Sequence, residues 1–142
     1  MEPSSVEYVL QWVRALALLS KPKEALGVLK TARQRGLQTA ALELTTVELQ
    51  IEAKQSVEWT RLELVKALDG PRLFAKARYL KAMGLRLAGK SREASILLEA
   101  YLDALPASVL ASRESLLWCE LGNAYWDMGQ QREAIAAYQL GL

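Results

Sequence analysis

The stretch Trp118-Cys119-Glu120-Leu121-Gly122-Asn123-Ala124-Tyr125 decides the fold of this chain, together with Ala134, Tyr138 and Gly141 farther along. Trp118 and the residues at positions 121, 122 and 125 lie three and four residues apart, so on a helix they share one face. The three later residues have similar spacing beyond a glycine at position 129, which suits a tight turn. The stretch therefore predicts two short antiparallel helices, whose small residues let the two backbones approach closely.

The spacing of these residues resembles the signature of the tetratricopeptide repeat, W-x-x-L-G-x-x-Y…A-x-x-x-F…P, which has a period of about 34 residues. Six residues carry the resemblance, with Tyr in the place of the family's Phe: Trp118, Leu121, Gly122, Tyr125, Ala134 and Tyr138. The resemblance implies an all-α fold, a right-handed superhelical solenoid of antiparallel helix pairs with about eight helices. Because one such repeat cannot bury its apolar face alone, the resemblance also implies further repeats upstream.

Three fainter units precede this one. Comparable turns lie at residues 89–94 and 20–25, and apolar residues follow each turn at similar offsets. The first helix of the first unit would pack through Val9, Trp12, Val13 and Leu16. The weakest unit lies between the two turns, with Leu44, Val47 and Ile51 on its first helix and Thr60, Leu64 and Ala67 on its second.

These units divide the chain into four repeats, at residues 6–40, 41–74, 75–114 and 115–142. Consecutive starts lie 35, 34 and 40 residues apart, close to the family's period. The six extra residues of the last interval, around residues 107–114, are expected to lengthen the helix that begins the fourth unit.

Local signals agree with these boundaries. Ser4 and Glu7 have the spacing of a capping box, which predicts a helix start there. Pro22 suits the first turn of a helix, and Gly36 suits the left-handed residue just past a helix end. Asp69-Gly70-Pro71 predicts the end of the fourth helix and the start of the fifth. Since no segment alternates with the two-residue period of a half-buried strand, the sequence predicts helices throughout.

Composition fits one soluble domain, residues 1–142. The chain has 142 residues, 51% of them hydrophobic, which is enough for a real core. Its apolar stretches are interrupted by polar residues and fall short of the roughly 20 residues needed to span a bilayer. A secretory leader is not evident at the N-terminus. We therefore expect a cytoplasmic protein that does not enter membranes.

The residues needed for most catalysis and metal binding are scarce. Cys119 is the single cysteine and the chain contains no histidine, so the usual zinc ligand sets and every Ser-His or Cys-His pairing are excluded. In the repeat frame Cys119 lies one residue from the packing face, as a small half-buried side chain. We expect no catalytic residues, no metal and no cofactor.

One motif points toward nucleotide chemistry. Residues 84–91, Gly-Leu-Arg-Leu-Ala-Gly-Lys-Ser, match the phosphate-binding pattern G-x-x-x-x-G-K-[ST]. That chemistry needs a strand that feeds a flexible loop, whereas the residues before and between these glycines are good helix formers. Because Gly89 also coincides with Gly129 in the repeat frame, we interpret the motif as a repeat turn.

Charge is distributed unevenly along the chain. Residues 1–36 carry six basic and three acidic side chains, whereas residues 91–142 carry three basic and seven acidic ones. A solvated outer face is the simplest interpretation. A nucleic-acid surface is disfavoured, because aromatic residues do not interleave with the basic ones as stacking platforms would. A third alternative is head-to-tail contact between a basic first repeat and an acidic last one.

The resemblance places function on the concave surface, which is lined by the first helix of each pair. The residues it assigns to that groove are Leu10, Gln11, Arg14, Thr46, Leu49, Lys76, Tyr79, Leu80, Met83, Arg86, Leu116, Glu120, Asn123 and Trp126. Their mixture of apolar centre and charged edge suits a helix or an extended peptide. The alternative is that some of these side chains pack on a neighbouring helix or on another copy of the chain.

The resemblance also narrows the choice of partner. Family members that hold chaperone C-terminal carboxylates use Lys, Asn and Arg at particular concave sites, where this chain has Leu10, Arg14, Thr46, Lys76 and Leu80. Lys76 alone matches, so chaperone-tail binding is disfavoured. The repeats are also similar to the sensor segments of large bacterial transcription regulators, which gives an alternative function in oligomerisation or signal relay.

The last repeat ends without a polar capping helix, so we expect Tyr138, Leu140 and Leu142 to form an assembly face. A longer parent protein, a partner or a second copy would cover that face, the last of these as a homodimer. The sequence thus predicts a non-catalytic scaffold that binds a protein or peptide in its concave groove.

Overall fold

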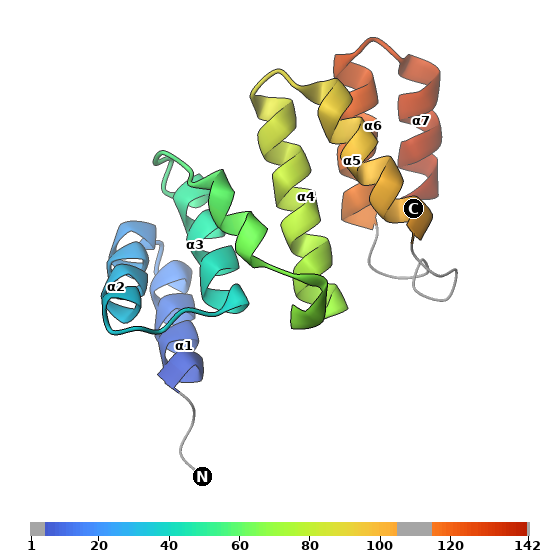
Figure 1. Ribbon diagram of the computed structural model, residues 1–142. Coiled ribbons are helices and arrows are strands. Elements are labelled where there is room, and N and C mark those ends of the chain that lie inside the picture. The colour runs from blue at the N-terminus through green and yellow to red at the C-terminus, as the bar shows by residue number, and fades with distance from the viewer. Residues whose placement is uncertain (1–4, 105–114, 142) are drawn as a thin grey trace. The chain divides into compact units, whose positions relative to one another are not determined.

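The computed structural model describes residues 5–104 and 115–141, which form α-helices and short 3₁₀ segments (Figure 1). The elements in chain order are α1 (Ser5–Leu18), α2 (Pro22–Gln34), α3 (Ala40–Glu52), the 3₁₀ segments η1 (Trp59–Leu64) and η2 (Ala67–Asp69), α4 (Pro71–Leu87), α5 (Ser91–Ala104), α6 (Ser115–Asp127) and α7 (Gln131–Leu140). Within the described ranges there is no strand, so the prediction of an all-α chain is confirmed. None of the described helices has the length and apolar character that crossing a bilayer requires.

The chain divides into two compact units, Met1–Leu73 and Phe74–Leu142. The division lies close to the predicted boundary between the second and third repeats, and α4 begins in the last residues of the first unit. Ser4 of the predicted capping box and residues 107–114, the expected extension of the fourth unit, lie outside the described residues.

The first unit has a core built from three helices. The α1–α2 pair contributes Val9, Val13, Ala25, Leu29 and Ala32, and α3 contributes Leu42 and Leu49. Pro22 lies in the first turn of α2, where its missing N–H is harmless, and Gly36 follows α2 with a φ of 86°. Both positions are as the sequence predicts.

One residue of the predicted packing face of α1 does not pack in this core. The side chain of Trp12 is 49% exposed, whereas its neighbour Val13 is 2% exposed. The reason is geometric, because Val9 and Val13 face the core cluster shared with α2 and α3, and Trp12 lies about a quarter turn from Val13.

The second unit contains the helix pair that the deciding stretch predicts. α6 and α7 pack closely because Gly122 has no side chain: a Cβ at that position would lie 2.5 Å from the Tyr138 ring. The Tyr138 hydroxyl then donates a hydrogen bond to Asn123 Oδ1. Leu121 and Ala134 are buried, as their places in the pattern predict.

The core of the second unit joins all four of its helices. Its buried members are Ala82 of α4, Ala94, Leu98 and Leu102 of α5, Leu117, Leu121 and Ala124 of α6, and Ala137 of α7. α6 is central to this core, because both α5 and α7 pack against it.

Four turns share one hydrogen-bonding pattern, and the turn at Gly36 after α2 has the same pair of bonds. Ser20, Lys54, Gly89 and Gly129 all have φ between 56° and 81°. In each turn this residue's N–H binds the carbonyl three residues back, and the next N–H binds the carbonyl five residues back. That pair of bonds is the Schellman motif, which satisfies the carbonyls left free at a helix end. The turns at Ser20, Lys54, Gly89 and Gly129 follow each other by 34, 35 and 40 residues, and the turn at Gly36 lies between the first two of them.

The prediction of an α-helix over Thr60, Leu64 and Ala67, in the second predicted repeat, is wrong. In its place the chain forms η1 and η2, which are 3₁₀ rather than α-helical. Side chains of α3 fix this segment, since Gln50 bonds both the backbone N–H and the carboxylate of Glu58, and Glu43 binds Arg61. Leu62 and Val65 supply the buried apolar contacts that the predicted helix would have supplied.

Candidate functional site

An ion pair joins α4 to α6 at the centre of the predicted site in the second unit. Arg86 Nε lies 2.5 Å from Glu120 Oε1, and Arg86 Nη1 lies 3.5 Å from Asp127 Oδ2. The Glu120 side chain is only 3% exposed, so its charge depends on this partner. The hydrogen bond to Glu120 raises the pKa of Arg86, which keeps the guanidinium charged.

Polar contacts extend this ion pair to both neighbouring helices. Asn123 Nδ2 lies 3.5 Å from the other Glu120 oxygen. The Oδ1 atom of Asn123 accepts a hydrogen bond from the Tyr138 hydroxyl. Ser91 Oγ donates to Asp127 from the first turn of α5. Burial, followed by the charge of Glu120, raises the pKa of Tyr79, so this phenol stays neutral at physiological pH.

Around these contacts lies a stripe of side chains that keep open surface, which we call the α4–α6 surface. It consists of Lys76, Tyr79, Met83 and Arg86 on α4 and Leu116, Asn123 and Trp126 on α6. The residues are spaced three, four or seven apart on each helix and so project from one side of it. Leu116 is 58% exposed and Trp126 is 53% exposed, while Tyr79 and Met83 are half-buried. Seven of the predicted residues therefore keep accessible surface on α4 or α6.

Two other predicted residues of this unit lie inside it. Leu80 is 4% exposed and faces the interior, on the same side of α4 as the buried Ala77 three residues before it. Glu120 is 2% exposed and is committed to Arg86. Neither side chain has free surface to offer a partner.

The predicted site residues of the first unit are accessible on α1 but buried on α3. On α1, Gln11 and Arg14 are exposed and Leu10 is half-buried. On α3, Thr46 and Leu49 are 3% and 4% exposed, and the Thr46 hydroxyl donates to the carbonyl of Leu42. α3 is buried at these positions because it packs against α2 and also against the 3₁₀ segment that follows it.

The predicted assembly face is smaller than expected. Leu140 is 64% exposed on α7, but Tyr138 turns toward α6 and packs at Gly122. Leu142 lies outside the described residues. Ile135 is 51% exposed and was not predicted, although its position one helical turn before Gln139 marks it as surface.

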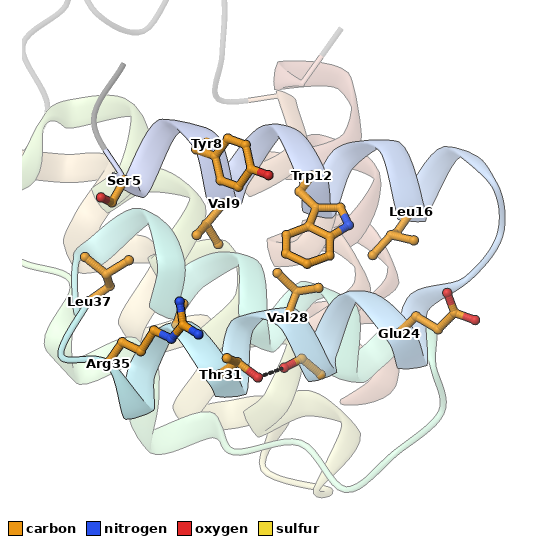
Figure 2. A pocket seen from close by; sticks show the side chains of 12 residues that line it. Ser5, Tyr8, Val9, Trp12, Leu16, Glu24, Val28, Thr31, Arg35 and Leu37 are labelled. Atoms are coloured by element: carbon orange, nitrogen blue, oxygen red, sulfur yellow. Dashed lines mark hydrogen bonds between the residues drawn. The ribbon is translucent and has the colours of Figure 1, made fainter. Parts of the chain in front are cut away.

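A groove between α1 and α2 is the feature that the sequence patterns missed (Figure 2). It has a volume of about 1080 Å³, and its apolar lining includes Tyr8, Val9, Trp12, Leu16, Val28 and Leu37. Trp12 and Val28 approach each other from the two helices, with Glu24 at one end and Arg35 at the other (Figure 2). The four-residue spacing of Tyr8, Trp12 and Leu16 was the available signal, because such spacing makes a continuous apolar stripe.

The phosphate-loop pattern is a helix followed by a turn. Gly84 is buried within α4, the helix continues to Leu87, and Gly89 forms one of the four repeated turns. The backbone N–H groups of Gly89 and Lys90 bind carbonyls of α4, so they cannot surround a phosphate.

The single cysteine is more exposed than predicted. Cys119 lies on the solvent side of α6 and is a free, exposed thiol rather than a half-buried one. Among the described residues, no three His, Cys, Asp or Glu side chains gather in a way that could hold a metal ion.

The chain was also compared with known proteins. A scan against protein-family models finds no match. A search of the curated proteins likewise finds no match. The function is therefore inferred from the chain's own residues and geometry.

Proposed function

We propose that this chain is a helical-repeat scaffold of tetratricopeptide type that binds a protein or peptide segment and catalyses nothing. The observation that carries the proposal is the α4–α6 surface, where the charges pair with one another while aromatic and sulfur-containing side chains remain accessible. Such a surface binds through apolar anchors, which supply most of the energy of peptide recognition.

The charges at this surface favour binding over chemistry. Arg86 is held by Glu120 and Asp127, and Asn123 is held by Glu120 and Tyr138. Groups held this firmly position their neighbours but have no free proton or nucleophile to offer a substrate. Met83 and Trp126 are the side chains left to contact a partner.

The repeated turns support the repeat assignment. Four of the five turns of this type, at Ser20, Lys54, Gly89 and Gly129, are spaced by 34, 35 and 40 residues, close to the family period of about 34, and the fifth, at Gly36, would join the first repeat to the second. In this interpretation the helix pairs form a right-handed solenoid, and α1 offers Leu10, Gln11 and Arg14 as α4 and α6 offer the residues of the α4–α6 surface. A cytoplasmic location accompanies the proposal, since a single exposed thiol suits a reducing compartment.

Peptide display tests the proposal. The wild-type chain would be used to select binders from a random peptide library, and the selected peptides would be measured by fluorescence anisotropy. We expect Met83→Glu and Tyr79→Ala to weaken binding at least about ten-fold, the loss typical of a contact at the centre of an interface. Ile96→Glu is the matched control, because Ile96 is 55% exposed on α5 and lies outside the α4–α6 surface. Unchanged binding by both test variants would sink the proposal.

A second function has one observation in its favour. Ile135 and Leu140 expose apolar surface on α7, which suits oligomerisation or signal relay within a larger bacterial transcription regulator. Light scattering over a range of protein concentrations tests it. This function predicts a concentration-dependent dimer that Leu140→Glu converts to a monomer; a monomer at all concentrations contradicts it.

A further inference from the structure

The α1–α2 groove lies on a face that the chain itself covers in another helix pair. The repeated turns make Ser20 equivalent to Gly129, so residues of α1 and α2 correspond to residues of α6 and α7 that follow 109 positions later. By this correspondence Tyr8 matches Leu117, and Trp12 matches Leu121.

The two faces differ greatly in exposure. Tyr8 and Trp12 are 64% and 49% exposed, whereas Leu117 and Leu121 are 2% and 3% exposed. The leucines are buried because α5 lies over them, with Leu98 and Leu102 in the same core cluster. The second unit thus shows that an amphipathic helix fits the part of this face that the first helix of the pair provides, since α5 packs on α6.

We propose that the α1–α2 groove docks an acidic amphipathic helix of a partner protein. The groove follows α1 from Ser5 to Leu16, about 17 Å of helix axis at 1.5 Å per residue, which matches roughly three turns of a docked helix. Gly27 opens the α2 wall, since a Cβ there would have nothing within 4 Å. A second helix can therefore approach the α2 backbone closely at this point.

The charge of the residues around the groove favours an acidic partner helix. Residues 5–38 carry six basic and two acidic side chains. Arg35 lines one end of the groove and Glu24 the other, and Lys23 and Lys30 are exposed on α2 outside the lining. α5, which packs on α6 in the second unit, is itself acidic. It carries three carboxylates, Glu93, Glu99 and Asp103, and one basic residue, Arg92. Complementary charge would steer such a helix to the groove and set its direction along it.

A second copy of this chain suits the groove less well. The exposed apolar residues of α7 would have to enter it, but the charges of α7, Arg132 and Glu133, cancel. Such a head-to-tail contact would also leave the same two surfaces free at the ends, which produces open-ended chains rather than a closed dimer.

The sequence of α5 provides a probe of known chemistry. A fluorescent peptide of Ser91–Ala104, stapled between the exposed positions Ile96 and Ala100, keeps its apolar stripe and its carboxylates. Two further versions carry the three carboxylates changed to their amides or to lysine. Anisotropy titrations with the full chain should give the tightest binding for the natural peptide and the weakest for the lysine version, with the difference reduced at high salt.

Gly27 provides a matched pair of variants. Gly27→Ala adds one methyl group in open space, and we expect it to bind the peptide within about two-fold of wild type, since one buried methylene is worth less than a factor of ten. Gly27→Gln adds a longer neutral side chain to the groove wall at a position whose Cβ meets nothing, so its fold should be kept while peptide affinity falls at least about ten-fold. Met83→Glu should leave the peptide affinity unchanged, which separates this groove from the α4–α6 surface.

Three results would overturn the proposal. The first is equal affinity of the Gly27→Gln and Gly27→Ala variants for the natural peptide, or a failure of the wild-type chain to bind any of the three peptide versions. The second is indifference to the charge of the peptide. The third is a concentration-dependent self-association, measured by sedimentation, that both Gly27→Gln and Leu140→Glu abolish, since a second copy would then be the occupant.

Discussion

Gly122 shows how one missing side chain fixes the distance between two helices. Its Cβ position lies 2.5 Å from Tyr138 Cε1 and 2.7 Å from Tyr138 Cδ1, so the ring takes the place of a side chain. The same ring carries the hydroxyl that binds Asn123. Packing and polar contact at this point therefore depend on the absence of a single methyl group.

Gly122→Ala should lower the free energy of unfolding by about 1–2 kcal/mol. Overpacking a close contact costs about 1–3 kcal/mol, and the better helix propensity of Ala returns up to about 1 kcal/mol. Urea denaturation measures the change. The control is Gly122→Ala combined with Tyr138→Leu: if the ring causes the loss, the substitution should become neutral or stabilising in that background, and an equal loss would contradict the explanation.

Arg61 neutralises a carboxylate in the interior of the first unit. Its Nη1 lies 2.8 Å from Glu43 Oε2, and the Glu43 side chain is 3% exposed. Its other contact, to Glu58, is 2.8 Å long, but the Glu58 side chain is 53% exposed. Of the two pairs, the buried one carries the larger penalty when broken.

Arg61→Met should destabilise the chain by about 3–5 kcal/mol, because it leaves the Glu43 carboxylate buried without a partner. Glu58→Gln, which breaks the exposed pair, should cost under about 1 kcal/mol. Denaturant titration of both variants gives the comparison. Adding Glu43→Leu to Arg61→Met should restore much of the loss; if both single variants lose the same amount, the buried pair is not the important one.

At the scale of elements, the four turns are the feature that repeats. Gly89 and Gly129 adopt left-handed backbone without strain, whereas Ser20 and Lys54 adopt it with a Cβ present. The hydrogen bonds are nevertheless the same in all four turns. The packing of the helices on either side must therefore impose the turn where the residue does not favour it.

Ser20→Gly and Lys54→Gly should each stabilise the chain by about 0.5–1 kcal/mol. A left-handed conformation costs an L-residue roughly 1–2 kcal/mol, and the greater freedom of glycine in the unfolded chain offsets part of the gain. Thermal and urea unfolding report the change. Gly129→Ala is the reverse control and should destabilise by about 1 kcal/mol; a loss of stability in the two glycine variants would show that the turns are not strained.

At the scale of the whole molecule, three tyrosines tie stability to high pH. Burial raises the pKa of Tyr79, Tyr125 and Tyr138, and a hydrogen bond from Tyr125 to the Glu99 carboxylate raises that pKa further. Since the folded pKa exceeds the unfolded value of about 10, folding favours the neutral phenols. Their contribution is fully present below pH 10 or so and is lost as the pH rises through the folded pKa.

The melting temperature should therefore fall as the pH rises above about 10, and it should fall less for Tyr125→Phe, which has no phenol to ionise at that position. Calorimetry across this range measures the difference. Absorbance of the phenolate reports the ionisation independently. Parallel curves for the two proteins would mean that Tyr125 does not contribute to the pH dependence.

Several helix ends could be predicted because they depend on local chemistry. Pro22 begins α2, Gly36 ends it in left-handed backbone, and α4 begins at Pro71. The deciding stretch also gave the α6–α7 pair with Leu121 buried and Gly122 against an aromatic ring. Each of these features involves residues within about one turn of one another or a fixed helical spacing, which a sequence displays directly.

The candidate site was only partly predictable. Helical spacing placed Tyr79, Met83 and Trp126 on open surface, but it did not reveal that Leu49 and Leu80 face inward. Which side of a helix is covered depends on the number of helices packed around it, and α3 is almost surrounded where its pattern alone predicts one open face. A single sequence shows the spacing of apolar residues along a helix, but it does not show which other helices pack around that helix.

The sequence by itself thus determined the helical class, most helix ends and the period of the turns, because capping, backbone freedom and apolar spacing act over a few residues. Tertiary structure alone decided three things: that Glu43 and Gln50 hold residues 58–61 in 3₁₀ form, that Trp12 lies beside an open groove, and that Arg86 closes on Glu120. These contacts join residues up to 34 positions apart, and their energies depend on burial, which exists only once the helices have packed.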